Sequence, residues 1–162
     1  MIYIAHRGLI FGPDYEKENK VSTIDFALDN GFDVELDLWV IDHKLYLGHD
    51  FKDIKKISFG YISERKENLW IHAKNSEALQ FLSALDKNED LHYFWHQEDD
   101  YTLTSKNIPW IYPGRDVLST GVIVMPELVM EISNINNLTA KGVCSDYVDN
   151  IRENHSKFES ST

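Results

Sequence analysis

Short apolar runs that alternate with helical or loop segments are the feature that most constrains the fold of this chain. Runs of this length, each bounded by polar residues, are typical of parallel strands in a sheet that is covered by helices. The pattern therefore predicts an α/β protein. Seven strand candidates lie at 2–5, 32–34, 69–74, 91–96, 109–112, 121–125 and 142–146. One βα unit of an ordinary eight-stranded barrel is thus expected to be missing.

The first fifty residues predict a strand, a helix and a second strand, followed by a hairpin. Ser22-Thr23-Ile24-Asp25 has the form of a capping box with Asp in the acidic position, and Asn30-Gly31 is a typical helix end. The hairpin is expected over residues 39–48, where a polar turn separates two apolar arms and the second arm leads into His49.

Polar motifs stand where these elements end. Glu35 and Asp37 are two residues apart, so on a strand both side chains point to the same face, with Leu36 on the other face. A pair of acids on one face is an oxygen-ligand site for a hard divalent cation. With two histidines and an arginine they make up the groups that metal-assisted phosphate chemistry uses. The motifs are His6-Arg7-Gly8, Glu35-Leu36-Asp37 and His49-Asp50.

Length and composition restrict the class of protein. At 162 residues the chain is long enough for one domain, but a full barrel typically needs about 250 residues. We expect a trimmed barrel over residues 1–150 and a polar C-terminal tail over residues 151–162. The net charge of -11 argues against nucleic acid as a partner, because a basic face supplies most of that affinity.

Cysteine content and the start of the chain bear on its location. The single cysteine, Cys144, excludes an intramolecular disulfide and is expected to be a buried hydrophobe. The chain starts directly on its first apolar run, with no signal-peptide pattern and no long apolar segment. These observations predict a cytoplasmic protein without stable membrane insertion.

The order of the motifs resembles a known enzyme family. His6-Arg7-Gly8, Glu18-Asn19, the short helix, Glu35-Leu36-Asp37 and His49-Asp50 follow one another as in the glycerophosphodiester phosphodiesterases, within the wider phospholipase C-like phosphodiesterase superfamily. The match is dense over residues 2–50 and thinner beyond, where 69–74 and 142–147 resemble the third and last strands of the family. The resemblance implies a TIM-type (β/α) barrel, here small or incomplete, with its site at the carboxyl ends of the strands.

The resemblance also implies a role for each polar residue. His6 and His49 would act as general acid and base, without a decision on which is which. Arg7 and Lys74 would bind the substrate phosphate. The metal would be held by Glu35 and Asp37. Glu18 and Asp50 would support the site without touching the metal, and Asp99 and Glu127 are further candidates just past strand ends. The remaining histidines, 43, 92, 96 and 155, are expected to be structural.

One residue departs from the family pattern. In the family a glutamate precedes the lysine by two positions and completes the carboxylate shell of the metal, whereas this chain has His72 before Lys74. Strand alternation puts both side chains on one face, so His72 could ligate the metal directly. An imidazole ligand would favour magnesium, manganese or zinc over calcium. The alternative is a site that has lost a ligand and binds metal weakly or not at all.

The resulting functional hypothesis is a hydrolase of lipid metabolism that depends on a divalent metal ion. It would cleave a small glycerophosphodiester into glycerol phosphate and an alcohol. Two alternatives stay open, which are a lyase that releases a cyclic phosphate and a non-catalytic phosphate-binding module. The Glu35 and Asp37 carboxylates are expected to be exposed, so that their removal abolishes activity without unfolding the protein. The missing barrel unit is expected to leave a sheet edge that a homodimer would cover.

Overall fold

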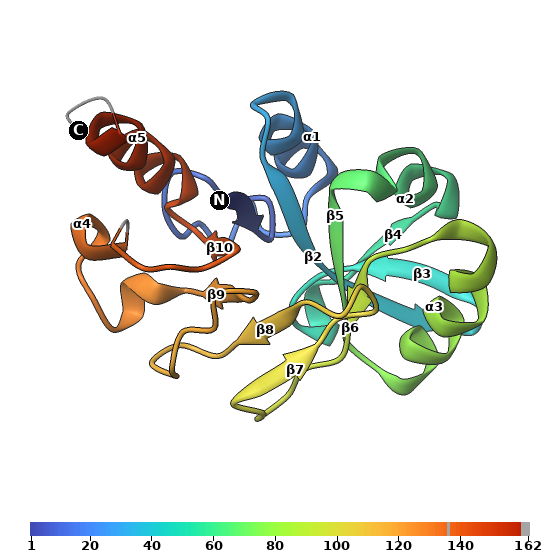
Figure 1. Ribbon diagram of the computed structural model, residues 1–162. Helices are drawn as coiled ribbons and strands as arrows, with labels where there is room; N and C mark the ends of the chain where they lie inside the picture. Colours follow the sequence, from blue (N-terminus) through green and yellow to red (C-terminus); the bar gives the residue numbers. More distant parts are fainter. Residues whose placement is uncertain (136, 160–162) are drawn as a thin grey trace.

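Parallel strands form a curled, open half-barrel in the computed structural model of the chain, which describes residues 1–135 and 137–159 (Figure 1). Within these residues the parallel part has the seven strands that the apolar runs predict. From one edge to the other they are β6 (Tyr93–Phe94), β5 (Leu69–Ala73), β2 (Asp33–Ile41), β1 (Ile2–His6), β10 (Gly142–Ser145), β9 (Val122–Val124) and β8 (Pro109–Ile111). The prediction of an incomplete (β/α) barrel is confirmed.

Antiparallel strands extend this sheet at two places. Strand β3 (Lys44–Leu47) returns along β2 in the expected hairpin, and β4 (Lys55–Ile57) pairs with β3. Both residues of the hairpin turn, Asp42 and His43, have positive φ, which is the backbone of the two-residue turns that fit the twist of a hairpin. The expected strand at 32–34 and the first hairpin arm are one continuous strand, β2. Strand β7 (Tyr101–Leu103) pairs with β8.

Helices cover the outer face of the curl. The α-helices are α1 (Val21–Asp29), α2 (Phe59–Arg65), α3 (Ser76–Glu89), α4 (Ile132–Ile135) and α5 (Val148–Glu159), and the 3-10 helices are η1 (Phe51–Asp53), η2 (Lys66–Asn68) and η3 (Pro126–Leu128). Helix α1 packs against β2, α3 packs against β2 and β5, and α5 packs against β1, β10 and α4. Among the described residues, no helix is long and apolar enough to span a bilayer.

The expected capping box at the start of α1 is wrong. The helix begins two residues earlier, with Lys20 in place of Ser22 as the N-cap, and no side chain in the described part of the chain caps it. The Lys20 carbonyl accepts hydrogen bonds from the amides of Thr23 and Ile24, so Ser22 lies inside the first turn. The Asp25 carboxylate instead accepts hydrogen bonds from two residues of α2. The helix ends as expected at Asn30, and Gly31 follows with a φ of 78°.

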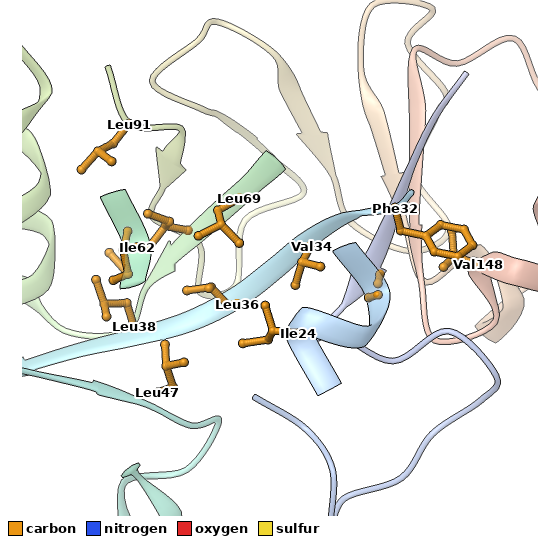
Figure 2. Close-up of a cluster of buried hydrophobic side chains, with 14 of the residues drawn as sticks. Ile24, Phe32, Val34, Leu36, Leu38, Leu47, Ile62, Leu69, Leu91 and Val148 are labelled. Atoms are coloured by element: carbon orange, nitrogen blue, oxygen red, sulfur yellow. The ribbon is translucent and has the colours of Figure 1, made fainter. Parts of the chain in front are cut away.

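Strand β2 separates the core from the polar interior of the curl. Val34, Leu36 and Leu38 are fully buried on its outer face, against helices α1, α2 and α3 (Figure 2). Glu35 and Asp37 point the opposite way, because successive strand residues alternate between faces. The predicted alternation of these two acids with Leu36 is therefore confirmed.

A smaller apolar cluster closes the bottom of the curl. It contains Ile4, Trp70, Phe94, Trp110, Val122 and Cys144, all at most 3% exposed. The rings of Phe94 on β6 and Trp110 on β8 lie 4.5 Å apart between centroids and join the two ends of the parallel sheet. The expected burial of Cys144 is confirmed, and burial raises the pKa of its thiol.

The division of the chain at residue 150 stays a prediction. Helix α5 runs through this point and buries Val148 and Ile151 against the core. Residues 160–162 of the expected tail lie outside the described part of the chain.

We expect the protein to form a homodimer at micromolar concentration. Strands β6 and β8 end the parallel sheet, and Ser105 covers part of the β6 edge through hydrogen bonds with the backbone of Tyr93. A typical specific interface buries about 1,600 Å² in total, which is enough to persist at this concentration. Light scattering measures the mass directly, and a monomer at micromolar concentration would mean that loops such as that of Ser105 cover the edge sufficiently.

Candidate active site

The polar motifs surround one pocket at the carboxyl ends of the parallel strands. The pocket has a volume of about 480 Å³. Its lining includes all five residues for which this placement is expected, His6, Glu35, Asp37, His49 and His72, together with Arg7 and Lys74. The prediction that these residues meet in one place is confirmed, although they come from β1, β2, β5 and the loop after β3.

The two carboxylates of β2 are buried, which corrects the expectation that they are exposed. Glu35 is 3% exposed and Asp37 is 1% exposed. The inner face of β2 carries them into the curl, where side chains from β1 and β5 cover them. Because a buried carboxylate needs positive or hydrogen-bonding partners, their surroundings decide both the stability and the chemistry of the site.

Asp37 is held by cations and by an amide. Its Oδ2 lies 3.2 Å from Arg7 Nε and accepts a hydrogen bond from Asn19 Nδ2 at 2.9 Å, while its Oδ1 lies 3.4 Å from Lys74 Nζ. The side-chain oxygen Oδ1 of Asn19 in turn accepts a hydrogen bond from the Asp37 backbone amide. Burial alone would raise the pKa of Asp37, but His72, Arg7 and Lys74 hold this pKa far below its usual range. Asp37 is therefore ionised at neutral pH.

Glu35 has the opposite tendency. Its Oε2 accepts a hydrogen bond from the Arg7 backbone amide at 3.1 Å, and its Oε1 lies 3.8 Å from His72 Nδ1. Burial and the charge of Asp37 raise the pKa of Glu35. Two acids that share a small buried space cannot both ionise easily unless a cation joins them. The pair is therefore suited to a divalent ion.

His72 faces these two acids in a fixed orientation. Its Nε2 donates to the backbone carbonyl of His96 at 2.9 Å, since a carbonyl oxygen can only accept. Nδ1 is therefore the ring nitrogen that faces the acids, and it lies 3.1 Å from Asp37 Oδ1. Ligating histidines commonly use their second nitrogen in this way. The ring stacks on Phe94 with 5.1 Å between centroids, which fixes its plane.

The donor atoms of Glu35, Asp37 and His72 lie within 4.8 Å of one another and could hold a metal ion. Two carboxylate oxygens and one imidazole nitrogen suit magnesium, manganese or zinc, whereas calcium prefers oxygen ligands. The residues present therefore fit a divalent cation. Its identity and its binding stay a prediction.

The phosphate-binding candidates lie beside this group. Arg7 bridges Asp37 and Glu18, whose Oε2 accepts a hydrogen bond from Arg7 Nη1 at 2.9 Å. Glu18 thus contacts Arg7 and does not belong to the donor group of the candidate metal site. Lys74 directly follows β5 and reaches the same pocket. Both cations are mostly covered, with 16% of each side chain exposed, so their charges are only partly screened by water.

His6 is supported by a carboxylate that the motif pattern does not indicate. Its Nδ1 lies 2.8 Å from Oδ1 of Asp146, which is 4% exposed and directly follows β10. Burial opposes a positive charge on the ring, but the Asp146 hydrogen bond and the charge of Glu35 raise the pKa of His6. The one sequence signal for Asp146 is an acid at the carboxyl end of a parallel strand.

Glu127 contributes to this support and not to the metal group. Its Oε1 accepts hydrogen bonds from Ser145 Oγ at 2.7 Å and from the Asp146 backbone amide at 3.2 Å. The Glu127 carboxylate therefore holds the segment that carries Asp146. Asp99, the other late candidate, is exposed and contacts His96 at 3.4 Å. It lies outside the residues that line the pocket.

His49 is the more exposed of the two candidate acid–base residues, with 43% of its side chain accessible. Burial and the nearby charge of Arg7 lower the pKa of His49. Its Nδ1 lies 3.3 Å from Oδ1 of Asp50, an exposed residue at the start of η1. Within the described part of the chain, the Asp50 side chain makes no capping hydrogen bond to η1. Its carboxylate contacts His49 instead.

The other histidines differ in their positions. His92 lies against Trp70 and pairs with Thr104, and His155 contacts Tyr3, so both have the structural surroundings that were expected. His43 occupies the hairpin turn. His96 lines the pocket, and its backbone carbonyl accepts a hydrogen bond from His72 Nε2. The expectation that His96 is structural stays a prediction.

We expect Asp146→Asn to lower kcat and to move one limb of the pH profile. The carboxylate raises the pKa of His6, so its replacement by an amide should lower that pKa and shift the limb that His6 controls to lower pH. The loss in kcat should be about 10- to 100-fold, a part of what a positioned acid–base group contributes. Profiles of kcat/KM against pH measure both effects. An unchanged profile would show that His6 does not titrate during turnover.

The comparisons with known proteins concern the fold. No protein-family model and no curated protein matches the sequence. The crystal structure of a glycerophosphodiester phosphodiesterase from Agrobacterium tumefaciens matches with a TM-score of 0.59 and 16% identity, over 96% of this chain and 100% of that chain. A structure from Silicibacter pomeroyi, assigned as a glycerophosphoryl diester phosphodiesterase, matches with a TM-score of 0.52 and 9% identity, over 98% and 94% of the two chains. The chain therefore has the fold of these proteins.

Proposed function

We propose that this protein is a metal-dependent phosphodiesterase that cleaves a small glycerophosphodiester into glycerol phosphate and an alcohol. The observation that carries the proposal is the meeting of two histidines, two buried carboxylates and two cations in one pocket. The fold, shared with glycerophosphodiester phosphodiesterases, supports the same reaction class. Location in the cytoplasm and a role in lipid metabolism stay predictions.

Glu35, Asp37 and His72 would hold the divalent cation. When bound there, the cation neutralises phosphate charge and lowers the pKa of a coordinated hydroxyl. The three side chains are already fixed by the Arg7 amide, by Asn19 and by the His96 carbonyl, respectively. Little reorganisation is needed, which is the usual advantage of a preorganised site.

Arg7 and Lys74 would bind the phosphate of the substrate. Arg7 offers a planar set of donors, and Lys74 offers a compact charge that can move on its flexible stem. Both now contact Asp37, which keeps their charged ends in the pocket. Together they would neutralise the anionic diester that otherwise repels an attacking oxygen.

His6 and His49 would transfer the protons. One of the two rings takes the proton of the attacking hydroxyl, and the other ring gives a proton to the leaving oxygen. The Asp146 contact occupies His6 Nδ1, so His6 Nε2 would be the atom that exchanges a proton with the substrate. The pKa of His6 is raised and that of His49 is lowered, so His6 keeps its proton to a higher pH than His49 does.

A product assay tests the proposal. Purified protein is incubated with a set of glycerophosphodiesters and with magnesium, manganese, zinc or calcium, and the products are followed by ³¹P NMR. Glycerol phosphate is the expected product. His6→Ala and His49→Ala should each slow its release by about 10²- to 10⁴-fold. Turnover by both variants at the wild-type rate would contradict the assigned roles.

The same assay separates the two alternatives. A cyclic phosphate that accumulates and is not opened would identify a lyase. One observation favours the phosphate-binding module. Arg7 and Lys74 already contact Asp37, so side chains balance the charge of this carboxylate without a metal ion. Phosphate binding without turnover under any metal condition would support that module and exclude the hydrolase.

A further inference from the structure

The pocket has two halves of different chemistry. Its charged half comes from β1, β2, β5 and the loop after β3, which supply the residues that the proposed reaction uses. Its other half comes from β6, β8, β9 and η3. The apolar wall is defined as Phe94, Trp110, Tyr112, Val124, Met125 and Leu128, and the polar residues His96 and Gln97 line the pocket beside it. The proposed reaction at phosphorus uses none of these side chains, so their role in the pocket needs a separate explanation.

The apolar wall offers little to a small polar alcohol. Among the described residues that line the pocket, the acids are Glu35 and Asp37, and both are buried in the charged half. A cationic alcohol such as choline would therefore find no carboxylate on the wall. Glycerol-like hydroxyl groups would meet mostly carbon atoms on the wall. Polar groups placed against such a surface lose hydrogen bonds to water and gain none from the protein.

The wall leads from the buried floor of the pocket to its mouth. Phe94 and Trp110 are 2% and 3% exposed and pack against each other, so they close the floor. Tyr112 is 45% exposed and Leu128 is 66% exposed. Val129, the next residue in the sequence after Leu128, is 54% exposed and lies outside the residues that line the pocket. The apolar wall therefore includes both buried residues and residues exposed at the surface.

We propose that the alcohol part of the substrate carries an unbranched apolar chain, which lies along the apolar wall and leaves the pocket over Leu128. The inference rests on the proposed function, because it takes the charged half as the place of the phosphodiester. The phosphate then sits at Arg7 and Lys74, the glycerol phosphate lies on the charged side, and the chain covers Val124, Tyr112 and Leu128. An extended chain matches a set of apolar residues that range from the buried Phe94 and Trp110 to the exposed Tyr112 and Leu128.

Chain length gives the first test. Glycerol-3-phospho-n-alkyl esters from methyl to octyl are compared below the concentrations at which they aggregate. Burial of one methylene group should raise kcat/KM about fourfold, until the chain extends past Leu128 and the gain stops. A value of kcat/KM that does not change with chain length would overturn the inference.

A charge test separates an apolar chain from choline bound by the aromatic rings. Glycerophosphocholine is compared with the corresponding 3,3-dimethylbutyl ester, which has the same shape without the positive charge. The neutral ester should be cleaved at least as fast, because the wall has no carboxylate. A preference of tenfold or more for the choline ester would overturn the inference in favour of a cation–π site.

Two leucine variants locate the chain. Leu128→Ser should reduce the ratio of kcat/KM between octyl and methyl esters by about fourfold or more, since it removes apolar contact at the mouth. The matched control is Leu118→Ser. Leu118 is 40% exposed, precedes β9 and lies outside the residues that line the pocket. The same ratio in Leu128→Ser, Leu118→Ser and wild type would show that the chain does not cross Leu128.

A binding experiment separates this inference from the proposed function. Affinities for n-alkyl phosphates are measured by tryptophan fluorescence, because Trp95 and Trp110 line the pocket. Affinity that rises with chain length in a protein without turnover would leave the apolar wall in place and exclude the hydrolase. Turnover of glycerophosphodiesters together with alkyl phosphate affinity that is independent of chain length would overturn the inference and leave the hydrolase in place.

Discussion

Removing the metal or either carboxylate of β2 is expected to abolish turnover. Excess EDTA should stop the reaction, and added magnesium or manganese should restore it. Glu35→Ala and Asp37→Ala should each reduce kcat by about 10³-fold or more, because both side chains would hold the cation on which charge neutralisation depends. Initial rates of glycerol phosphate release measure these effects. Full activity in excess chelator would contradict the metal-dependent mechanism.

The two substitutions should differ in stability. Asp37→Ala removes the carboxylate that contacts Lys74 and one of the two that contact Arg7, so it should lower the free energy of unfolding by about 3 kcal/mol. Glu35 has a raised pKa and depends less on these cations, so Glu35→Ala should cost less. Urea unfolding measures both. Equal stability of Asp37→Ala and wild type would mean that the Arg7 and Lys74 contacts contribute no net stability.

Strand β2 also supplies a matched control. Asp33 lies on the same face as Glu35 and Asp37, but at the amino end of the strand. Its carboxylate accepts hydrogen bonds from the side chains of Asn68 and Trp70, which an asparagine oxygen can partly replace. Asp33→Asn should therefore keep the metal dependence and the rate of the wild type. Losses of equal size at positions 33, 35 and 37 would indicate a general effect on β2 and not a metal site.

Replacing His72 by glutamate is expected to move the metal preference toward calcium. The substitution exchanges a nitrogen donor for carboxylate oxygens next to Glu35 and Asp37, and hard cations such as calcium prefer oxygen ligands. Turnover should survive with an altered order of metals. The ratio of kcat/KM with calcium to that with magnesium measures the change, and it should increase by about tenfold or more, the usual size of an effect at a metal site.

His72→Gln is the control for shape. Glutamine has nearly the same size as glutamate but no charge, so it should bind metal poorly and lose most of the turnover. If the site has decayed, the wild type will show no metal-dependent turnover and His72→Glu will restore some. If neither variant changes the metal order or the rate, His72 does not ligate the metal, and its contacts with Asp37 and the His96 carbonyl are structural.

Much of the fold can be predicted from the sequence because its signals are local. Apolar runs mark each parallel strand, and the two-residue spacing of Glu35 and Asp37 places both on the inner face of β2. The end of α1 at Asn30 follows from Gly31, which adopts a positive φ without strain. The start of α1 is predicted wrongly, because Asp25 contacts Tyr61 and Arg65 of α2 and does not cap its own helix.

The sequence by itself determined which face of its strand each acid takes, since this depends on spacing along the chain. The expectation that Glu35 and Asp37 follow the end of a strand is wrong, because β2 continues to Ile41. Only the tertiary structure decided their partners and their burial. Asp146 supports His6 across 140 positions because β10 pairs with β1, and no local pattern contains that pairing. The His96 carbonyl orients His72 because β6 pairs with β5. Glu35 and Asp37 are buried because the sheet curls around them, and curvature is a property of all the strands together.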